Sequence, residues 1–263
     1  MKISIITVVY NNQNTINNAI DSVLNQTYEN IEYIIIDGAS TDGTVDIVKS
    51  YGNKIDKFIS EPDNGIYDAM NKGIVLATGD IIGILNADDF YADNTVLATV
   101  VEKMQYEGAD SLYADLDFAQ QDNVNKTVRK WRSKPYKTDL FKNGWHPAHP
   151  TFFVRKNIYD KYGRFNLEFK ISADYEIMLR FLVKHKISVI YLPKVLVKMR
   201  IGGVSNGNIN NIIKANIESY KSWKVNGLKI NPLSFIKKPL SKILQFKFFS
   251  FLKKNNWRAF WWR

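Results

Sequence analysis

Short apolar runs alternate with stretches of helical periodicity over about the first 105 residues, and this alternation restricts the possible folds more than any other feature of the chain. The runs at residues 3–9, 31–36 and 81–85 are rich in Ile and Val, which is typical of strands buried on both faces. Residues 16–24 lie between the first two runs and carry apolar side chains at helical spacing. We therefore expect an α/β domain with a mostly parallel, doubly wound sheet.

Further elements continue the same rhythm, with Asn12 or Asn14 available to cap the first helix. We expect helices at residues 44–51, 66–77 and 94–106 and a short strand at 58–60. Such sheets bind their ligands at the carboxyl ends of the strands. No strand is followed by the glycine-rich fingerprint of a dinucleotide site or by a P-loop. This argues against a dinucleotide-binding fold and against a P-loop enzyme.

Three carboxylates stand at the predicted carboxyl ends of strands. Asp37 follows the second apolar run, and Asp88 and Asp89 follow the run at 81–85, so all three should lie at one rim of the sheet. Adjacent carboxylates repel each other unless a cation compensates, and oxygen ligands suit Mg²⁺ or Mn²⁺. The pattern indicates a divalent-metal site, although residues 86–89 also fit a polar turn that caps the next helix.

Four segments follow one another in the same part of the chain: TVVYN at 7–11, IDGASTDG at 36–43, EPDNGIYDAMNKG at 61–73 and ATGDIIGILNADD at 77–89. Together they resemble glycosyltransferase family 2, especially its branch that builds bacterial surface polysaccharides. The resemblance implies a GT-A fold, which is a Rossmann-like, mostly parallel sheet flanked by helices. It also implies inverting transfer of a sugar from a nucleotide-diphosphate donor, with Mn²⁺ or Mg²⁺ as cofactor.

The resemblance also implies which residues form the site. The nucleotide-sugar pocket would consist of Thr7, Tyr10, Asn11, Asp37, Asp63, Lys72, Asn86, Ala87, Asp88 and Arg200. Asp88 and Asp89 occupy the acidic metal motif and are both candidate ligands, while Asn86 replaces the Asp with which that motif usually begins. Asp37 and Asp63 can accept hydrogen bonds from a uracil or a ribose. Lys72 either contacts the phosphates or the base, or is an ordinary solvated lysine.

The second half of the chain is expected to supply the base and the acceptor site. The segment SADYEIMLR at 172–180 resembles a family motif whose second acid is the general base, and Asp174 stands at that position. An inverting transfer needs a base that takes the proton of the acceptor hydroxyl. Asp174 is therefore the expected catalytic residue, and Glu176 the reserve candidate in the acceptor site. Considered alone, both acids would also suit the amino end of a helix.

Two further segments suggest ligand contacts. In WHPAHPTFF at 145–153, His149 is expected to bind the acceptor, while His146 fits a structural loop position equally well. In RIGGVS at 200–205, glycines would let a loop close over the donor phosphates, with Arg200 or Ser205 reaching the diphosphate.

The positive charge of the chain is concentrated at its end. The formal net charge is +10, and residues 221–263 contain eleven Lys and Arg but no Asp or Glu. A nearly neutral body argues against a nucleic-acid-binding domain. The same segment carries Trp223, Trp257, Trp261 and Trp262, and an imperfectly amphipathic helix is expected after Pro239. Basic and aromatic residues together favour an anionic membrane surface, whereas packing onto the catalytic domain is the alternative.

The expected organisation is a GT-A domain at 1–220 and a membrane-associating tail at 221–263. Residues 1–105 would form the nucleotide-sugar half of the domain and residues 106–220 the acceptor half. The chain has no Cys and lacks both a signal-peptide pattern and a long apolar span. We therefore expect a cytoplasmic glycosyltransferase, peripheral on the inner face of the membrane, that glycosylates a lipid-linked saccharide. The alternatives are a nucleotidyltransferase acting on sugar phosphates and a non-catalytic sugar-binding protein at the membrane surface.

Overall fold

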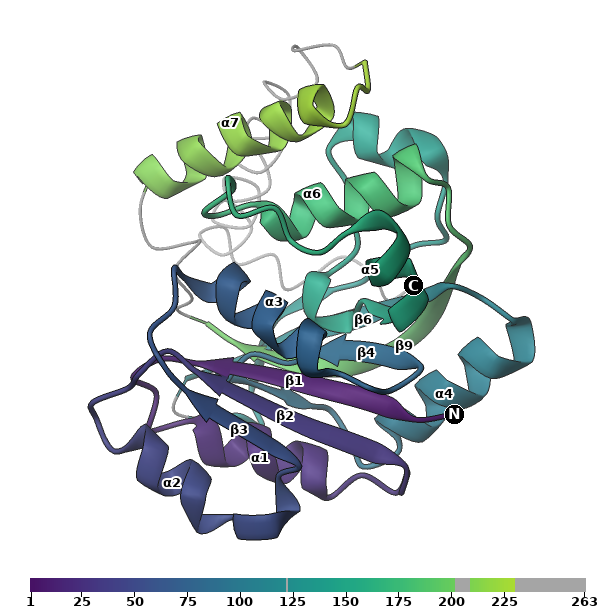
Figure 1. Ribbon diagram of the computed structural model, residues 1–263. Helices are drawn as coiled ribbons and strands as arrows, with labels where there is room; N and C mark the ends of the chain where they lie inside the picture. The colour runs from purple at the N-terminus through teal and green to yellow at the C-terminus, as the bar shows by residue number, and fades with distance from the viewer. Residues whose placement is uncertain (122, 202–208, 230–263) are drawn as a thin grey trace, which may run out of the picture.

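The structure of the chain is a computed structural model that describes residues 1–121, 123–201 and 209–229 (Figure 1). Several expectations concern residues outside these ranges, namely the closing of the loop at 202–205 over the donor, the helix after Pro239 and the membrane contact of Trp257, Trp261 and Trp262. Within the described residues no helix is long and apolar enough to cross a bilayer.

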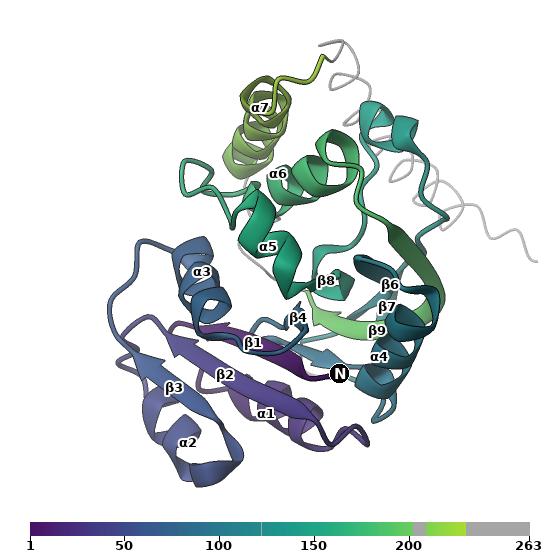
Figure 2. The same cartoon turned by 45° about the vertical axis from the view of Figure 1, so that its right-hand side comes forward.

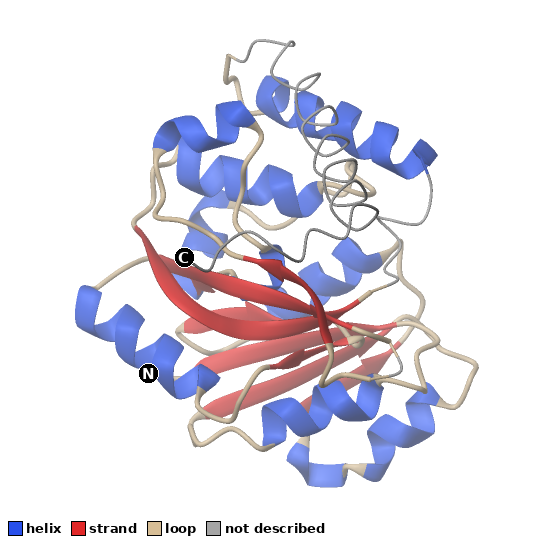
Figure 3. Cartoon of the chain, turned by 180° about the vertical axis from the view of Figure 1, so that it is seen from behind, coloured by secondary structure: helices blue, strands red, loops and turns tan. Residues whose placement is uncertain are grey.

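Nine strands of the described chain form one mixed sheet (Figure 3). They are β1 (Ile3–Val9), β2 (Ile31–Asp37), β3 (Lys57–Ser60), β4 (Ile81–Ile84), β5 (Asp89–Tyr91), β6 (Ser111–Ala119), β7 (Thr127–Trp131), β8 (Phe153–Arg155) and β9 (Val189–Arg200). Their order is β3-β2-β1-β4-β8-β6-β9-β5, and β7 pairs with β6. The four strands β1 to β4 are parallel to one another, as expected. In contrast, β8 is antiparallel to both of its neighbours, and β5 is antiparallel to β9.

Helices cover both faces of this sheet (Figures 1 and 2). One face carries α1 (Ile16–Leu24), α2 (Thr44–Ser50) and α4 (Val96–Glu107), and the other carries α3 (Ile66–Leu76), α5 (Lys156–Tyr162) and α6 (Ala173–Leu179). A π-helical turn at Arg180–Lys184 continues α6, and short 3₁₀ turns lie at Gly52–Lys54, Thr138–Asn143 and His149–Thr151. The last described helix, α7 (Ile209–Val225), packs on α6.

The two-sided packing explains the continuous apolar runs. In β1, Ile3 and Ile5 contact the helices of one face, whereas Ile6 and Val8 contact those of the other. Each fully buried side chain of this size contributes about 1.5–3 kcal/mol through the hydrophobic effect. Gly73 lets α3 approach β1 closely, because a Cβ atom at this position would lie 2.4 Å from the side chain of Ile6.

Two details differ from the expectations. The first helix begins after Thr15 and not after Asn12 or Asn14, because the carbonyl of Asn12 accepts the N–H of Thr15 in a preceding turn. The expected domain boundary between residues 220 and 221 falls inside α7. There Trp223 is buried and its indole N–H donates to the Tyr175 hydroxyl (2.9 Å). Trp223 therefore belongs to the core and not to a membrane-facing tail.

Candidate active site

The loops that follow β1 and β2 interlock at the carboxyl edge of the sheet. Asn11 has a left-handed backbone (φ 46°), its N–H donates to the Ser40 hydroxyl (2.7 Å), and its side-chain oxygen accepts the N–H of Thr41 (2.8 Å). Asp37 is fully buried and accepts the N–H of Ser40 (2.9 Å) and the hydroxyl of Ser60 (2.7 Å). The structure thus brings Asn11 and Asp37 together, with the Asp37 carboxylate held in a fixed orientation.

Tyr10, Gly38 and Asp63 meet beside these loops. A Cβ atom on Gly38 would lie 2.6 Å from Oδ2 of Asp63 and 3.4 Å from the ring of Tyr10. The other carboxylate oxygen of Asp63 accepts the N–H of Gly65 (2.8 Å), and the Tyr10 ring is largely exposed. An exposed aromatic ring can stack on a nucleobase. The fixed carboxylate beside it can accept a hydrogen bond from an N–H group of the same base.

Two residues expected in the nucleotide pocket have partners within the protein. The side chain of Thr7 is fully buried and its hydroxyl pairs with that of Tyr33 (3.0 Å), so the expectation that it lines the pocket is corrected. Lys72 binds a carboxylate oxygen of Glu61 (2.7 Å) and the carbonyl of Pro62 (2.9 Å). The hydrogen bond to Glu61 raises the pKa of Lys72. Lys72 therefore holds the loop that carries Asp63 and is not a simple solvated lysine.

The acidic turn after β4 contains two polar atoms without partners. The amide nitrogen of Asn86 donates to Oδ2 of Asp89 (3.2 Å), whereas Oδ1 of each residue is buried and accepts no hydrogen bond from the described residues. The carbonyl of Ala87 accepts the Thr15 hydroxyl (2.9 Å), which joins this turn to the loop after β1. Asn86 thus orients Asp89, although it replaces the Asp that the family motif usually carries.

Arg200 packs against the same turn. Its guanidinium donates to the carbonyl of Asp88 (2.7 Å) and to the side chain of Asn18 (3.1 Å). Burial raises the pKa of Asp88, and it raises the pKa of Asp89 well above its usual value, with the charge of Asp88 adding to the effect. The positive charge of Arg200 lowers the pKa of both carboxyl groups, but it offsets the effect of burial only in part. The pair therefore favours additional positive charge nearby.

These residues suit a divalent cation that completes its coordination with a ligand. No group of three or more His, Cys, Asp or Glu residues forms a metal cluster in the described parts of the chain. However, the unpartnered oxygens of Asn86 and Asp89, together with the partly buried Asp88, provide hard oxygen donors. Mg²⁺ and related ions often bind through one or two carboxylates plus substrate phosphates.

Asp174 lies in a second cluster, at the start of α6. One of its carboxylate oxygens accepts the N–H of Tyr175 (2.8 Å) and lies 3.3 Å from the hydroxyl of Tyr67. The same hydroxyl donates to the carbonyl of Ile171 (2.7 Å), and the Tyr67 ring stacks on Phe165 (5.5 Å between centroids). Burial raises the pKa of Tyr67 well above its usual value, and the negative charge of Asp174 raises it further. Tyr67 therefore stays protonated beside Asp174.

His149, which was expected to bind the acceptor, lies in the same cluster. Its ring packs edge-on against Phe165 (5.8 Å). Burial lowers the pKa of His149, and the charge of Asp174 opposes this effect only in part. The imidazole is accordingly neutral near pH 7 and can both donate and accept a hydrogen bond. Tyr67 was not expected here, although it lies in the motif segment 61–73, in the first turn of α3 and four residues after Asp63.

Glu176 does not belong to the site, and this corrects the expectation of an acceptor-binding role. It is 2% exposed, pairs with Arg180 through both carboxylate oxygens (3.0 Å each) and accepts the amide of Asn226 (2.9 Å). Arg180 also donates to the carbonyl of Arg164 (2.6 Å). Residues two apart on a helix do not face the same side, so Asp174 and Glu176 diverge into different surroundings.

The chain is similar to known proteins over most of its length. The model of the family described as "Glycosyl transferase family 2" matches residues 4–163. A "PGL/p-HBAD biosynthesis glycosyltransferase" of Mycobacterium bovis is 29% identical over 194 residues, which are 71% of this chain and 72% of that protein.

Solved structures resemble the fold at low identity. S. aureus TarS 1-349 in complex with UDP-GlcNAc matches with a TM-score of 0.67 and 17% identity, over 89% of this chain and 69% of that chain. The mannosyltransferase PcManGT of Pyrobaculum calidifontis, in complex with GDP-Man and Mn²⁺, matches with a TM-score of 0.61 and 16% identity, over 89% and 66%. The chain spans 43% of the longer TarS chain. The expected α/β, GT-A fold is confirmed.

Proposed function

Because this chain belongs to glycosyl transferase family 2, we propose that it is an inverting, metal-dependent hexosyl- or N-acetylhexosaminyltransferase. Its donor would be a nucleotide-diphosphate sugar, preferably a UDP-sugar. Its acceptor would be a lipid-linked saccharide in the assembly of a bacterial O-antigen, capsule or exopolysaccharide. TarS bound to UDP-GlcNAc and PcManGT bound to GDP-Man and Mn²⁺ support the class of donor and cofactor.

One observation carries the proposal, namely that a single short segment connects the two halves of the site. This segment, residues 61–68, comprises the loop after β3 and the first turn of α3. Its loop sets Asp63 beside Gly38 and the exposed ring of Tyr10, and its helical turn sets the hydroxyl of Tyr67 against Asp174. A nucleotide held at Asp63 and a base at Asp174 are therefore connected through a few residues of the same segment. Such proximity is what a direct sugar transfer between two bound substrates requires.

The donor side uses the residues of the sheet edge. Tyr10 would stack on the base, while Asp37 and Asp63 would accept hydrogen bonds from the nucleoside. Asn86, Asp88 and Asp89 would hold Mn²⁺ or Mg²⁺, and the buried guanidinium of Arg200 fixes the backbone of that turn. When bound, the cation would supply positive charge for the leaving diphosphate.

The acceptor side would be carried by Asp174. Its free carboxylate oxygen would take the proton of the acceptor hydroxyl as that oxygen attacks the anomeric carbon opposite the diphosphate, which inverts the configuration. Tyr67 and the N–H of Tyr175 hold this carboxylate in place. Neutral His149 would hydrogen-bond the acceptor sugar beside it.

The experiment measures release of nucleotide diphosphate from a panel of UDP- and GDP-sugars, with MnCl₂ or with EDTA. We expect EDTA to abolish activity and Asp88→Asn to reduce donor turnover severely, with or without acceptor. Asp174→Asn should lower kcat for transfer about 10²- to 10⁴-fold, the range for loss of a general base, and leave donor binding intact. Asp46→Asn, at an exposed acid of α2, is the matched control. Normal transfer by Asp174→Asn would refute the assignment of the base.

The same proposal places the enzyme at the inner face of the cell membrane through its basic tail. Of the segment 221–263, the structure describes only residues 221–229, and these pack on the body through Trp223. The proposed membrane contact of the tail therefore concerns residues 230–263, which carry eight Lys and Arg and no acid. Attraction of such a segment to anionic lipids decreases as salt increases.

A further inference from the structure

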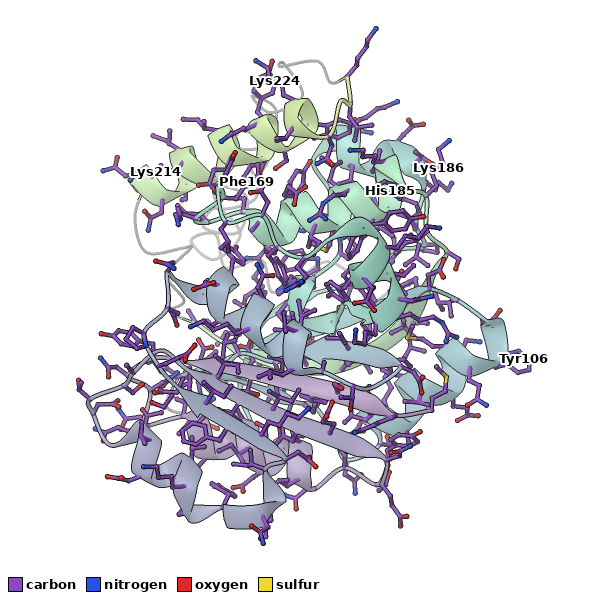
Figure 4. All side chains as sticks on the ribbon, viewed as in Figure 1. Tyr106, Phe169, His185, Lys186, Lys214 and Lys224 are labelled. Carbon is purple, nitrogen blue, oxygen red and sulfur yellow. The ribbon has the colours of Figure 1, made fainter. Side chains whose placement is uncertain are left out.

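The outer face of α7 combines exposed apolar side chains with lysines. Ile213 and Ile217 are 52% and 62% exposed and lie four residues apart, so they are neighbours on one side of the helix. Lys214, Lys221 and Lys224 flank them. Figure 4 shows Lys214 and Lys224 on α7 at the top of the molecule, away from the sheet.

The acidic residue of α7 is engaged by the segment that precedes α6. Glu218 accepts the N–H groups of Lys170 (3.0 Å), Ile171 (2.9 Å) and Ser172 (2.8 Å), which precede α6. Trp223, on another side of the helix, is buried in the core. The sequence of α7 contains no second Asp or Glu. Lys221 pairs with Glu168 (3.0 Å), so Lys214 and Lys224 supply the positive charge of the outer face. Apolar side chains beside lysines are the composition of a helix that lies on an anionic lipid surface.

A cleft in the body of the protein is lined by Tyr67, the neighbour of Asp174. The segment fixed by Glu218 lines this cleft with Leu167 and Lys170, opposite Ile66 and Tyr67 at the start of α3. Ile66 and Leu167 are 46% and 38% exposed and form an apolar rim, whereas Tyr67 reaches inward to Asp174 (3.3 Å). A ligand that enters over this rim therefore reaches Tyr67, whose hydroxyl contacts the proposed base.

We propose that the outer face of α7 and the apolar rim formed by Ile66 and Leu167 dock on an anionic lipid bilayer, so that the cleft beside Asp174 opens at the membrane surface. The inference deepens the proposed function, on which it rests for the lipid anchor of the acceptor. It assigns membrane contact to residues of the catalytic body, independently of the tail.

Charge complementarity selects the bilayer as the occupant of this face. The segment 230–263 contains only positive charges among its ionisable side chains, so the lysines of α7 would repel it. A second copy of the chain would bring the same lysines opposite each other in a two-fold symmetric contact. Anionic headgroups would instead neutralise the lysines, while Ile213 and Ile217 enter the boundary between headgroups and acyl chains.

The absence of Cys from the chain allows a direct test. The full chain with a single Ile217→Cys substitution is labelled with an environment-sensitive fluorophore. The labelled protein is mixed with vesicles of phosphatidylcholine alone or of phosphatidylcholine with about 30% phosphatidylglycerol, which makes the surface anionic. We expect a blue shift and about a twofold increase in emission with the anionic vesicles only, and quenching by nitroxide-labelled lipids. The matched control is Tyr106→Cys on α4, an 83% exposed site far from α7 in Figure 4, which should not respond.

A second variant tests the charge of the same face. Lys214→Gln/Lys224→Gln should weaken vesicle binding of the full chain about tenfold or more, given two lysines at an anionic surface, whereas Lys49→Gln/Lys54→Gln, on the opposite side of the sheet, should change it little. If the protein binds the vesicles but the emission of the label at position 217 does not change, the tail alone binds, and the inference is overturned. A label that responds to protein concentration without lipid would overturn it in favour of self-association. Nucleotide release from soluble donor, measured in parallel, tests the transferase proposal separately.

Discussion

At the scale of single residues, the hydroxyl of Tyr67 connects parts of the site that lie far apart in the chain. Tyr67→Phe retains the stacking on Phe165 but removes the donor next to Asp174. One hydrogen bond is worth about 1 kcal/mol, so we expect kcat for transfer to fall about three- to tenfold. The KM for the donor should stay the same, because Tyr67 lies on the acceptor side. Steady-state kinetics with Tyr106→Phe as control would measure both, and a change confined to the donor KM would contradict this role.

Glu32 illustrates how a buried charge ties strands together. It accepts the hydroxyls of Ser4 (2.5 Å) and Thr78 (2.8 Å) and pairs with Lys57 (2.9 Å). Burial alone would raise the pKa of Glu32, but the hydrogen bonds from these three residues outweigh it and lower the pKa to about 2. In the unfolded chain the same group titrates near pH ~4.3. Ionised Glu32 therefore stabilises the fold above about pH 4, and this contribution is lost as the pH falls toward 2.

The measurement is urea unfolding of Glu32→Gln at pH 7, 4 and 2.5. The free energy of unfolding should decrease by up to about 3 kcal/mol at pH 7, as expected for a pKa difference of roughly two. The difference from the unsubstituted chain should shrink at pH 2.5, where the carboxylate is no longer fully ionised in the folded state. Glu29→Gln, three residues away and exposed, is the control. A difference that does not depend on pH would indicate lost packing and not lost charge.

At the scale of elements, Glu218 fastens α7 to the segment that leads into α6. Glu218→Gln replaces one accepting oxygen with a donor group, so at least one of the N–H groups at 170–172 loses its partner. Hydrogen bonds to a charged group contribute about 1.5–3 kcal/mol, and we expect a loss of this size in the free energy of unfolding. Faster amide exchange at 170–172 should accompany it.

The matched control for this prediction is Glu168→Gln. Glu168 forms an exposed ion pair with Lys221 (3.0 Å), and such pairs contribute about 0–1 kcal/mol. Equal stability losses in the two variants would show that Glu218 acts only as a surface charge.

At the scale of the whole molecule, the boundary of the folded body can be tested by truncation. A chain that ends after residue 231 retains Trp223 and Asn226, so we expect it to unfold at nearly the same temperature as the full chain. A chain that ends after residue 220 lacks both, which leaves Glu176 without Asn226 and opens a cavity next to Tyr175. Loss of a buried Trp side chain costs about 3–5 kcal/mol. Thermal unfolding followed by circular dichroism compares the two, and equal stability would place the boundary at residue 220 after all.

The sequence by itself determined the elements whose signals are local. The apolar runs predicted β1, β2 and β4, and helical periodicity predicted α2, α3 and α4 to within one or two residues at each end. It also predicted that Asp37, Asp88 and Asp89 lie at the carboxyl ends of parallel strands, because this follows from chain direction alone. In the structure Asp37 ends β2, and Asp88 and Asp89 come after β4. The GT-A fold and the family follow from the same segments, since four motifs in order leave few other arrangements.

The tertiary structure alone decided which partner each polar side chain meets. Asp174 and Glu176 look equivalent in the sequence, but one lies beside Tyr67 and the other is buried against Arg180 and Asn226. In the sequence Trp223 cannot be distinguished from the aromatic residues of the tail. In the structure its indole lies in the core and donates to the hydroxyl of Tyr175. Periodicity specifies which face of an element is apolar, whereas the neighbour of that face comes from residues far away in the chain. Burial, ion pairing and pKa depend on that neighbour, so these properties appear only when the chain is folded.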